Sequence, residues 1–136
     1  MASNLQYSVA VRTAEVGSIE GTVGTSAKLQ IRTGTQPANC AAAASGTLIA
    51  ELSLPSDWMA AAASGAVAKT GTWSGTASNA GTAAHFRIYD SAGTTCHMQG
   101  TAGESGDTPD LVLDNKVITS GQTITISTFT ITAGNA

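Results

Sequence analysis

The side chains best suited to acid–base or metal chemistry in this chain are two histidines, His85 and His97. Each falls on the polar side of a predicted strand, and a turn at 90–93 joins the two strands, so the two imidazoles could lie near one another. A zinc site needs further ligands, and no carboxylate stands at a suitable neighbouring position. We therefore interpret both histidines as exposed polar residues on a sheet face, with a pH-sensitive contact patch as the alternative.

The chain has two cysteines, Cys40 and Cys96. They lie 56 positions apart, show no CxxC spacing and have no paired histidine ligands. We interpret them as small buried thiols. A disulfide stays open if the protein leaves the cell, and so does a reactive or metal-bound thiol.

Four carboxylates gather in one polar stretch, namely Glu104, Asp107, Asp110 and Asp114. Oxygen-rich loops can hold Ca²⁺, but this spacing matches no EF-hand, so we interpret the stretch as a solvated acidic loop, with calcium as the alternative. The sequence contains no GxSxG nucleophile elbow, P-loop lysine or GxGxxG core. We expect no catalytic residue, no metal and no cofactor, and we predict that the chain is not an enzyme.

The composition also limits the partners that the chain can have. Only 11% of its 136 residues are charged, against roughly 25% in an ordinary soluble domain. The net charge is -3 and no run of Lys or Arg occurs, which argues against nucleic acid and anionic membranes as partners. No stretch of roughly 18 or more apolar residues occurs, and the first residues lack the basic and apolar regions of a signal peptide. We expect synthesis in the cytoplasm.

Hydrophobic patterning divides the chain into an N-terminal arm and a β domain. Apolar residues recur at roughly helical spacing in 9–23, and Gly24 is a suitable C-terminal stop. We predict an arm with a short helix over residues 1–27 and a β domain over 28–136. Apolar residues that alternate with polar ones predict strands at 28–32, 47–54, 83–89, 94–99 and 123–132, and a capped helical turn is expected at 56–59.

The alternation also predicts which side chains point inward. In 83–89 the inward set is Ala84, Phe86 and Ile88, and the outward set is His85, Arg87 and Tyr89. In 47–54 the inward set is Leu48, Ala50, Leu52 and Leu54. About eight strands separated by turns favour an all-β fold, a jelly-roll or β-sandwich with one short N-terminal helix.

The two tryptophans and the terminal strand could each be buried in the core or against a partner. Trp58 and Trp73 are interpreted as core residues, with a protein interface and a carbohydrate-stacking platform as alternatives. In the terminal strand, Ile124 and Ile126 share one face, whereas Phe129 and Ile131 occupy the other. That change of parity near 127 predicts a β-bulge or a strand buried on both sides. Because large apolar residues are scarce, we expect further burial through an oligomeric or partner interface.

Most of the chain resembles small virion structural proteins of tailed double-stranded DNA bacteriophages. The resemblance is carried by the segments LQIRTGTQPANCAAAASGTLIAELSLPSDWM, GTAAHFRIYDSAGTTCHMQG and DLVLDNKVITSGQTITISTFTITAGNA. Its most specific parts are FRIYDSAGTT and the ending STFTITAGNA. The family implied is that of capsid cement (head decoration) proteins, and it brings no catalytic or ligand motif that could be mapped onto this sequence.

The resemblance implies a virion protein that coats the outer surface of an HK97-type capsid and stabilises the shell. Its partners would be the major capsid protein and copies of itself, as a homodimer, with a trimer as the alternative. The residues expected to contact the capsid or another partner are Leu5, Tyr7, Val9, Val11, Trp58, Phe129 and Ile131. The alternative function is a tail- or fibre-associated module that binds host-surface glycans.

Overall fold

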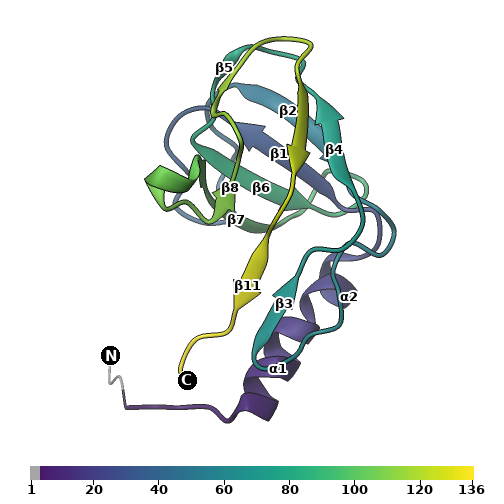
Figure 1. The fold of residues 1–136 in the computed structure, drawn as a ribbon, viewed down its shortest axis with the longest axis vertical. Helices are drawn as coiled ribbons and strands as arrows, with labels where there is room; N and C mark the ends of the chain where they lie inside the picture. Colours follow the sequence, from purple (N-terminus) through teal and green to yellow (C-terminus); the bar gives the residue numbers. More distant parts are fainter. Residues whose placement is uncertain (1–3) are drawn as a thin grey trace.

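The computed structural model describes residues 4–136 and is built mainly of β-strands, with 35% of residues in strands and 13% in helices. A body of curled sheets forms the wider part of the molecule (Figure 1). A narrower lower lobe holds the helices and one pair of strands, and the C-terminal end of the chain lies beside it. The prediction of a mostly β protein with N-terminal helical structure is confirmed. The first three residues of the predicted arm lie outside the described residues.

The body is organised around a five-stranded sheet with the strand order β2-β1-β6-β7-β8. The first four strands pair antiparallel, and β8 pairs parallel with β7. The strands are β1 (Lys28–Arg32), β2 (Leu48–Ser53), β6 (His85–Tyr89), β7 (Cys96–Gly103) and β8 (Leu111–Val112).

Alternating residues of β1 and β2 form one wall of the core. Leu29 and Ile31 are fully buried, as the pattern of 28–32 predicts. Strand β2 departs from strict alternation, because Ile31 pairs with Ala50 whereas Arg32 pairs with Leu48. The extra residue, Ile49, makes a bulge and is buried too, and Leu48 is only partly buried. The prediction of an inward face is therefore confirmed for Ala50, Leu52 and Leu54, whereas Leu48, on the other side of the bulge, is not fully buried.

Two short ladders complete the body. Strand β4 (Trp73–Thr76) pairs with β10 (Thr123–Ile126), and β5 (Gly81–Thr82) pairs with β9 (Val117–Ile118). Strand β4 runs close to β2, because a Cβ built on Gly75 would lie 3.0 Å from the Leu52 side chain. The β4–β10 ladder thus packs against the five-stranded sheet, with a continuous hydrophobic core between them.

A chain of aromatic rings crosses this core. Trp58 and Trp73 have ring centroids 5.9 Å apart, and Trp73 and Phe129 are 5.6 Å apart. Phe129 meets Phe86 edge to face at 5.7 Å. These separations are typical of stabilising aromatic pairs. The interpretation of both tryptophans as core residues is confirmed, since each is fully buried.

The lower lobe begins with a helix that is broken once. Helix α1 (Val9–Gly17) starts where the Ser8 hydroxyl accepts a hydrogen bond from the Val11 amide at 3.2 Å. Helix α2 (Ile19–Val23) follows after Ser18, whose hydroxyl donates to the Glu15 carbonyl at 2.7 Å. Gly24, with φ +99°, ends α2. The predicted helix within 9–23 and its glycine stop are confirmed, with a break at Ser18 that was not expected.

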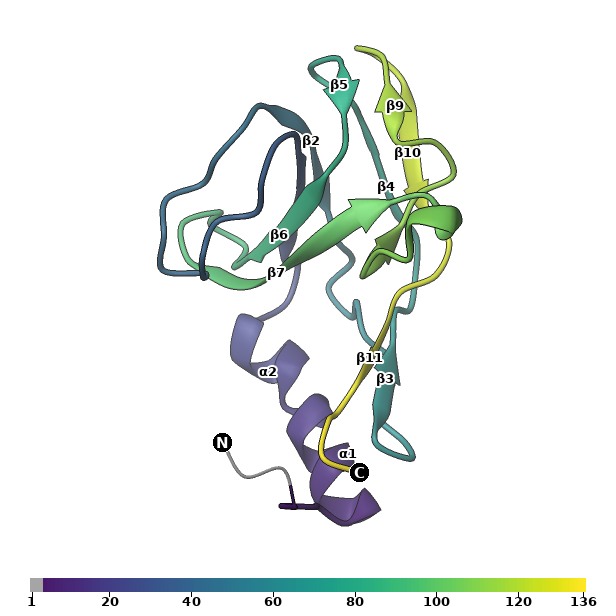
Figure 2. The same cartoon turned by 90° about the vertical axis from the view of Figure 1, so that its left-hand side faces the viewer.

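The lobe is completed by the antiparallel pair β3 (Ala66–Ala68) and β11 (Thr130–Thr132), with α1 packed against β3 (Figure 2). The predicted single strand over 123–132 is therefore wrong. The chain leaves the β4 ladder after Ile126 and joins β3 at Thr130, so two strands with different partners take its place. This change of partner explains the change of parity, since Phe129 is buried at the crossing and Ile131 packs inside the lobe.

Candidate functional site

Strand β6 is buried on both faces, because residues 33–47 fold over the side that was expected to meet solvent. All five of its residues are buried, with His85 0% and Arg87 1% exposed. In Figure 2 the dark blue segment that precedes β2 arches out beside β6 and β7. The prediction that His85, Arg87 and Tyr89 lie on an exposed face is wrong, and so is the interpretation of His85 as an exposed sheet residue.

Four polar side chains on this face hold the covering segment through its backbone; we call Arg32, His85, Arg87 and Gln99 the polar layer. Arg87 Nη2 donates to the Cys40 carbonyl at 2.8 Å and to the Ala42 carbonyl at 3.0 Å. The other three meet backbone carbonyls further along the same segment, Arg32 Nε at Ser45 (3.0 Å), His85 Nδ1 at Gly34 (2.9 Å) and Gln99 Nε2 at Pro37 (2.7 Å). Buried carbonyls need donors, and an alanine-rich segment supplies few of its own. The layer thus has a structural role.

His85 and His97 are not brought together. His85 lies opposite Thr101 in the β6–β7 ladder, whereas His97 is exposed at the other end of β7. Burial lowers the pKa of His85 below its ordinary value of 6.5, and the charges of Arg32 and Arg87 lower it further, while the hydrogen bond with the Gly34 carbonyl opposes the shift. At neutral pH the ring is therefore uncharged, and its Nδ1–H donates to Gly34.

Acidification should loosen this layer before the carboxylates respond. The unfolded chain binds a proton at His85 more readily than the folded chain does, so the stability present above pH 6.5 is lost as the pH falls below that value. We expect urea midpoints to fall between about pH 7.5 and about pH 5.5. His85→Gln, whose amide can still donate to Gly34, should flatten this dependence.

His97→Gln is the matched control, because it removes an exposed histidine from the same sheet, and it should keep the wild-type slope. Asp90 and Asp107 have pKa values lowered below 3.8 by hydrogen bonds from Thr94 and Lys116, so their contributions change at more acidic pH. An equal slope in His85→Gln and wild type would contradict the assignment.

The acidic loop uses its oxygens locally. Lys116 Nζ lies 2.8 Å from an Asp107 oxygen, and its amide donates to Glu104 at 3.1 Å. Asp110 accepts hydrogen bonds from the Thr101 amide and hydroxyl at 2.9 and 3.1 Å. Within residues 4–136 no three His, Cys, Asp or Glu side chains form a group able to hold a metal ion.

Open grooves on the surface offer little for chemistry. A groove of about 410 Å³ runs between the helices and residues 57–70, and its carboxylates are Glu20 and Asp57. Glu20 is already engaged, because one of its oxygens accepts the backbone N–H groups of Trp58 at 2.7 Å and of Met59 at 2.5 Å. These contacts also replace the helical turn predicted at 56–59, which is wrong: Met59 forms a β-bridge with Lys69 instead.

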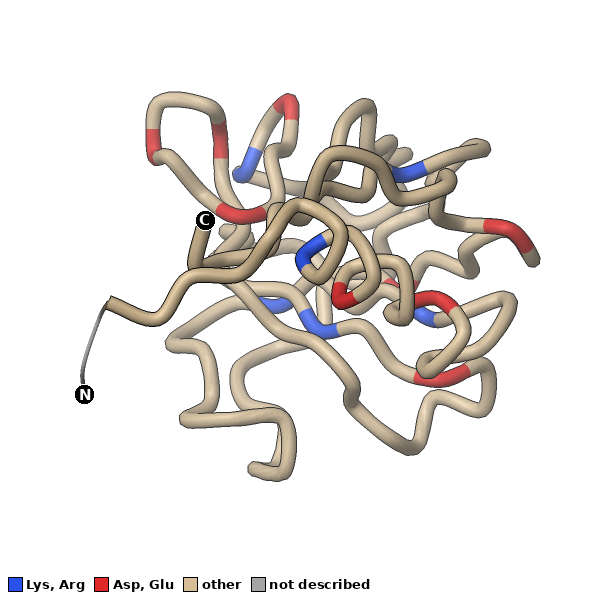
Figure 3. The backbone as a smooth tube through the Cα atoms, turned by 90° about the horizontal axis from the view of Figure 1, so that it is seen from below, with Lys and Arg blue, Asp and Glu red and all other residues tan. Residues whose placement is uncertain are grey.

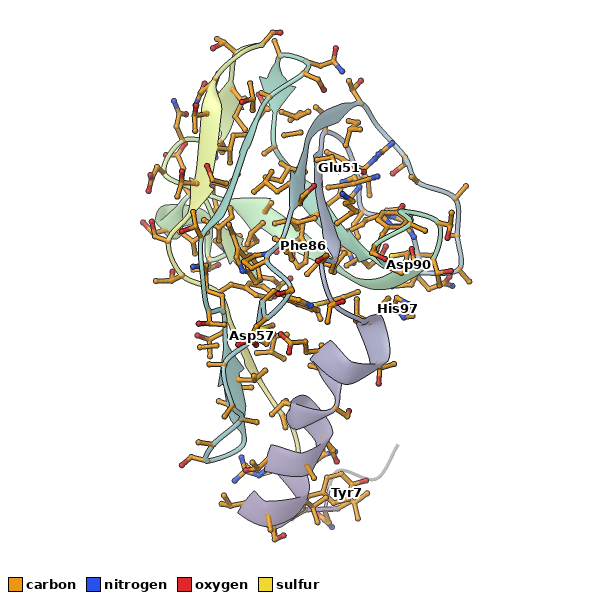
Figure 4. All side chains as sticks on the ribbon, turned by 90° about the vertical axis from the view of Figure 1, so that its right-hand side faces the viewer. Tyr7, Glu51, Asp57, Phe86, Asp90 and His97 are labelled. Carbon is orange, nitrogen blue, oxygen red and sulfur yellow. The ribbon has the colours of Figure 1, made fainter. Side chains whose placement is uncertain are left out.

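The predicted partner-contact residues separate into three groups. Leu5, Val9 and Val11 are 54%, 52% and 45% exposed at the tip of the lower lobe; we call these three the apolar tip. Tyr7 and Ile131 are partly buried nearby, and Figure 4 shows Tyr7 beside the first turn of α1. Trp58 and Phe129 are buried in the core, so direct contact of their side chains with a partner is not supported.

The apolar tip sits on a firmly held part of the chain. The Tyr7 amide donates to the Asn135 carbonyl at 2.7 Å, and Gln6 Nε2 donates to the Ala136 carbonyl at 3.0 Å. The Gly65 amide donates to the Thr13 hydroxyl at 2.9 Å. Seen from this end, basic and acidic residues are scattered and form no large patch of one sign (Figure 3). The three exposed apolar residues of the tip thus lie on an ordered part of the chain without a strong charge of one sign.

No protein-family model, curated protein or solved structure matches this chain. Within the part of the chain that the structure describes, no helix is long and apolar enough to cross a membrane. The relation to decoration proteins and the absence of enzymatic activity therefore stay predictions.

Proposed function

We propose that this chain is a virion structural protein that binds the outer surface of a phage capsid and stabilises the shell as a cement protein. The observation that carries the proposal is the apolar tip, in which Leu5, Val9 and Val11 stand about half exposed on an ordered helical lobe. Scattered single apolar residues are common on protein surfaces. Here three of them lie within seven positions of the sequence, and Val9 and Val11 point to different sides of the first turn of α1, so that this end of the lobe offers apolar groups to a partner that surrounds it.

The β body could separate the contacts that this chain makes with neighbouring capsid subunits. The five-stranded sheet faces the β4–β10 ladder across the aromatic core, which supports the finer assignment as a β-sandwich or jelly-roll. A cement protein needs no catalytic group, and the carboxylates of the acidic loop are paired locally. A rigid β body can bridge neighbouring capsomers without undergoing chemistry.

The apolar tip is small, and a capsid is a partner on which a weak single contact is sufficient. Three exposed apolar side chains contribute only a few kcal/mol when buried, at roughly 25 cal/mol per Å². An icosahedral shell repeats each contact many times, and an oligomeric protein engages several of them at once. The proposed partners are a major capsid protein of the HK97-type fold and a second copy of this chain, as a homodimer or a trimer, with location on the virion surface.

The glycan-binding alternative has less support. Sugar platforms use exposed aromatic faces, yet Trp58, Trp73, Phe86, Tyr89 and Phe129 are all buried. Tyr7, the sixth aromatic residue, is only partly exposed. No aromatic platform therefore supports that function.

Substitutions at the apolar tip test the proposal. Val9→Ser combined with Val11→Ser should weaken binding to undecorated shells by about tenfold or more, because apolar area no longer leaves water on binding. The melting temperature should stay close to that of wild type, since both valines are exposed. Binding is measured by co-sedimentation with shells of the phage that carries this chain.

Val117→Ser is the matched control, because Val117 is 58% exposed on β9, at the opposite end of the molecule from α1 (Figure 2). This variant should decorate shells as wild type does. Loss of decoration in Val117→Ser together with normal decoration by the Val9/Val11 variant would contradict the proposed surface.

A further inference from the structure

The two cysteines meet on the outer side of the five-stranded sheet. A single guanidinium group touches both: Arg87 Nη2 donates to the Cys40 carbonyl at 2.8 Å, and Arg87 Nε donates to Cys96 Sγ at 3.2 Å. The neighbouring Cys96 is also one of the causes that raise the pKa of Cys40. Cys40 and Cys96, which are far apart in the sequence, thus lie at the same edge of the Arg87 guanidinium group.

Each cysteine is held by its own segment. Cys96 begins β7 opposite Tyr89, and its thiol also lies 3.4 Å from the Met98 carbonyl. Cys40 belongs to the covering segment 33–47, which the polar layer holds at five backbone carbonyls along its length. Both thiols are free and partly buried, so a small oxidant can reach them.

We propose that Cys40 and Cys96 are a redox modification site at which a disulfide closes and fastens residues 33–47 over β6. The oxidant is a small disulfide such as oxidised glutathione. The inference concerns this chain's own fold, goes beyond capsid binding and does not depend on it.

The reaction proceeds by two thiol–disulfide exchanges. The Cys96 sulfur gives up its proton and attacks oxidised glutathione, whose S–S bond breaks, and a mixed disulfide forms as one glutathione leaves. The Cys40 sulfur then gives up its proton and attacks Cys96 Sγ, which releases the second glutathione. The two cysteines are oxidised by two electrons, one oxidised glutathione is reduced, and the two protons end on the two glutathione thiols.

The order of these steps follows from the surroundings of Cys40. Burial and the neighbouring Cys96 raise the pKa of Cys40 to about 11, which keeps its thiol protonated at neutral pH. We therefore assign the first attack to Cys96, whose sulfur accepts a hydrogen bond from Arg87 Nε at 3.2 Å. Closure should be faster at about pH 9 than at about pH 7, because more Cys40 thiolate is present for the second step.

The disulfide also predicts a gain in stability. It closes a long loop, since residues 41–95 lie between the two cysteines, and long loops gain most when cross-linked. For a protein of this size we expect the melting temperature to rise by on the order of 10 °C.

The test treats reduced full-length protein with oxidised glutathione and compares it with an untreated sample. We expect free thiols counted in denaturant to fall from two to zero, the monomer mass to fall by about 2 Da, and a Cys40–Cys96 cross-linked peptide after digestion. The melting temperature should rise and return to its starting value on reduction.

Cys40→Ser and Cys96→Ser are matched controls, because each leaves one thiol and cannot close the ring. Both should show no rise in melting temperature after the same treatment. In the wild-type protein, two unreacted thiols, stable glutathione adducts or disulfide-linked dimers would each overturn the proposal. These outcomes are read on the wild-type chain alone, so the test holds even if a variant fails to fold.

Discussion

Trp73→Ala is expected to lower the free energy of unfolding by about 3–5 kcal/mol, the largest effect of any single substitution considered for this chain. Trp73 is fully buried and packs between Trp58 and Phe129 in tilted pairs, with ring centroids 5.9 and 5.6 Å away. Truncation removes its apolar burial and leaves a cavity where β4 meets the five-stranded sheet. Small domains have only about 5–15 kcal/mol in total, so much of the variant population should unfold on mild heating.

Trp73→Phe is the control, measured with the alanine variant by urea denaturation. It keeps an aromatic ring in the cluster and loses the hydrogen bond from Nε1 to the Thr70 carbonyl, 3.1 Å long. We expect a cost of about 1–2 kcal/mol. If Trp73→Ala were as stable as Trp73→Phe, the aromatic chain would not be the centre of the core.

Glu20→Ala is expected to cost about 3 kcal/mol, because it leaves two backbone N–H groups without an acceptor. One Glu20 oxygen accepts from the amides of both Trp58 and Met59, and these two residues are buried. Hydrogen bonds to a charged group contribute about 1.5–3 kcal/mol each. This carboxylate therefore anchors the helical lobe to the body.

The control for that substitution is Glu15→Ala, which removes an exposed carboxylate from the same helical segment and should change stability by less than about 0.5 kcal/mol. Hydrogen exchange gives a second readout. The Trp58 and Met59 amides should exchange faster in Glu20→Ala than in Glu15→Ala. Equal exchange rates and equal stabilities in the two variants would show that the lobe is held by other contacts.

Local patterns in the sequence were sufficient for the elements whose partners lie close by. Leu29 and Ile31 alternate with polar residues and form β1 over Lys28–Arg32, and Gly24 stops the helix because only its backbone tolerates φ +99° readily. Exposure of Leu5, Val9 and Val11 is the part of the candidate site that sequence reasoning located, since all three were expected to meet a partner and all three stand about half exposed.

The sequence does not show which distant segment covers the second face of a strand. Alternation in β6 shows that Phe86 and Arg87 point to opposite faces, but it does not show that residues 33–47 return over the second face. The side chains of residues 33–47 do not indicate that this segment packs on β6, because its contacts are made by backbone carbonyls. Glu20 was missed for the same reason, since its partners lie 38 and 39 positions away.

Aromatic residues were ambiguous on physical grounds. Trp and Phe are favoured both in cores and at the centres of interfaces, so Trp58 and Phe129 could be placed in either from sequence. The scarcity of large apolar residues favoured the core for the tryptophans, and burial confirms it. Phe129 is buried because the chain leaves the β4 ladder after β10 and joins β3 in β11, and Phe129 lies at that crossing.

An electron-microscopy map of the intact particle that carries this chain tests most directly whether it is a capsid cement protein. We expect its β body as repeated density on the outside of the shell, with α1 and the apolar tip of Leu5, Val9 and Val11 turned toward the major capsid protein. Density for the chain only at the tail or fibres, or on the shell with β9 facing inward and the tip in solvent, would contradict the proposed function.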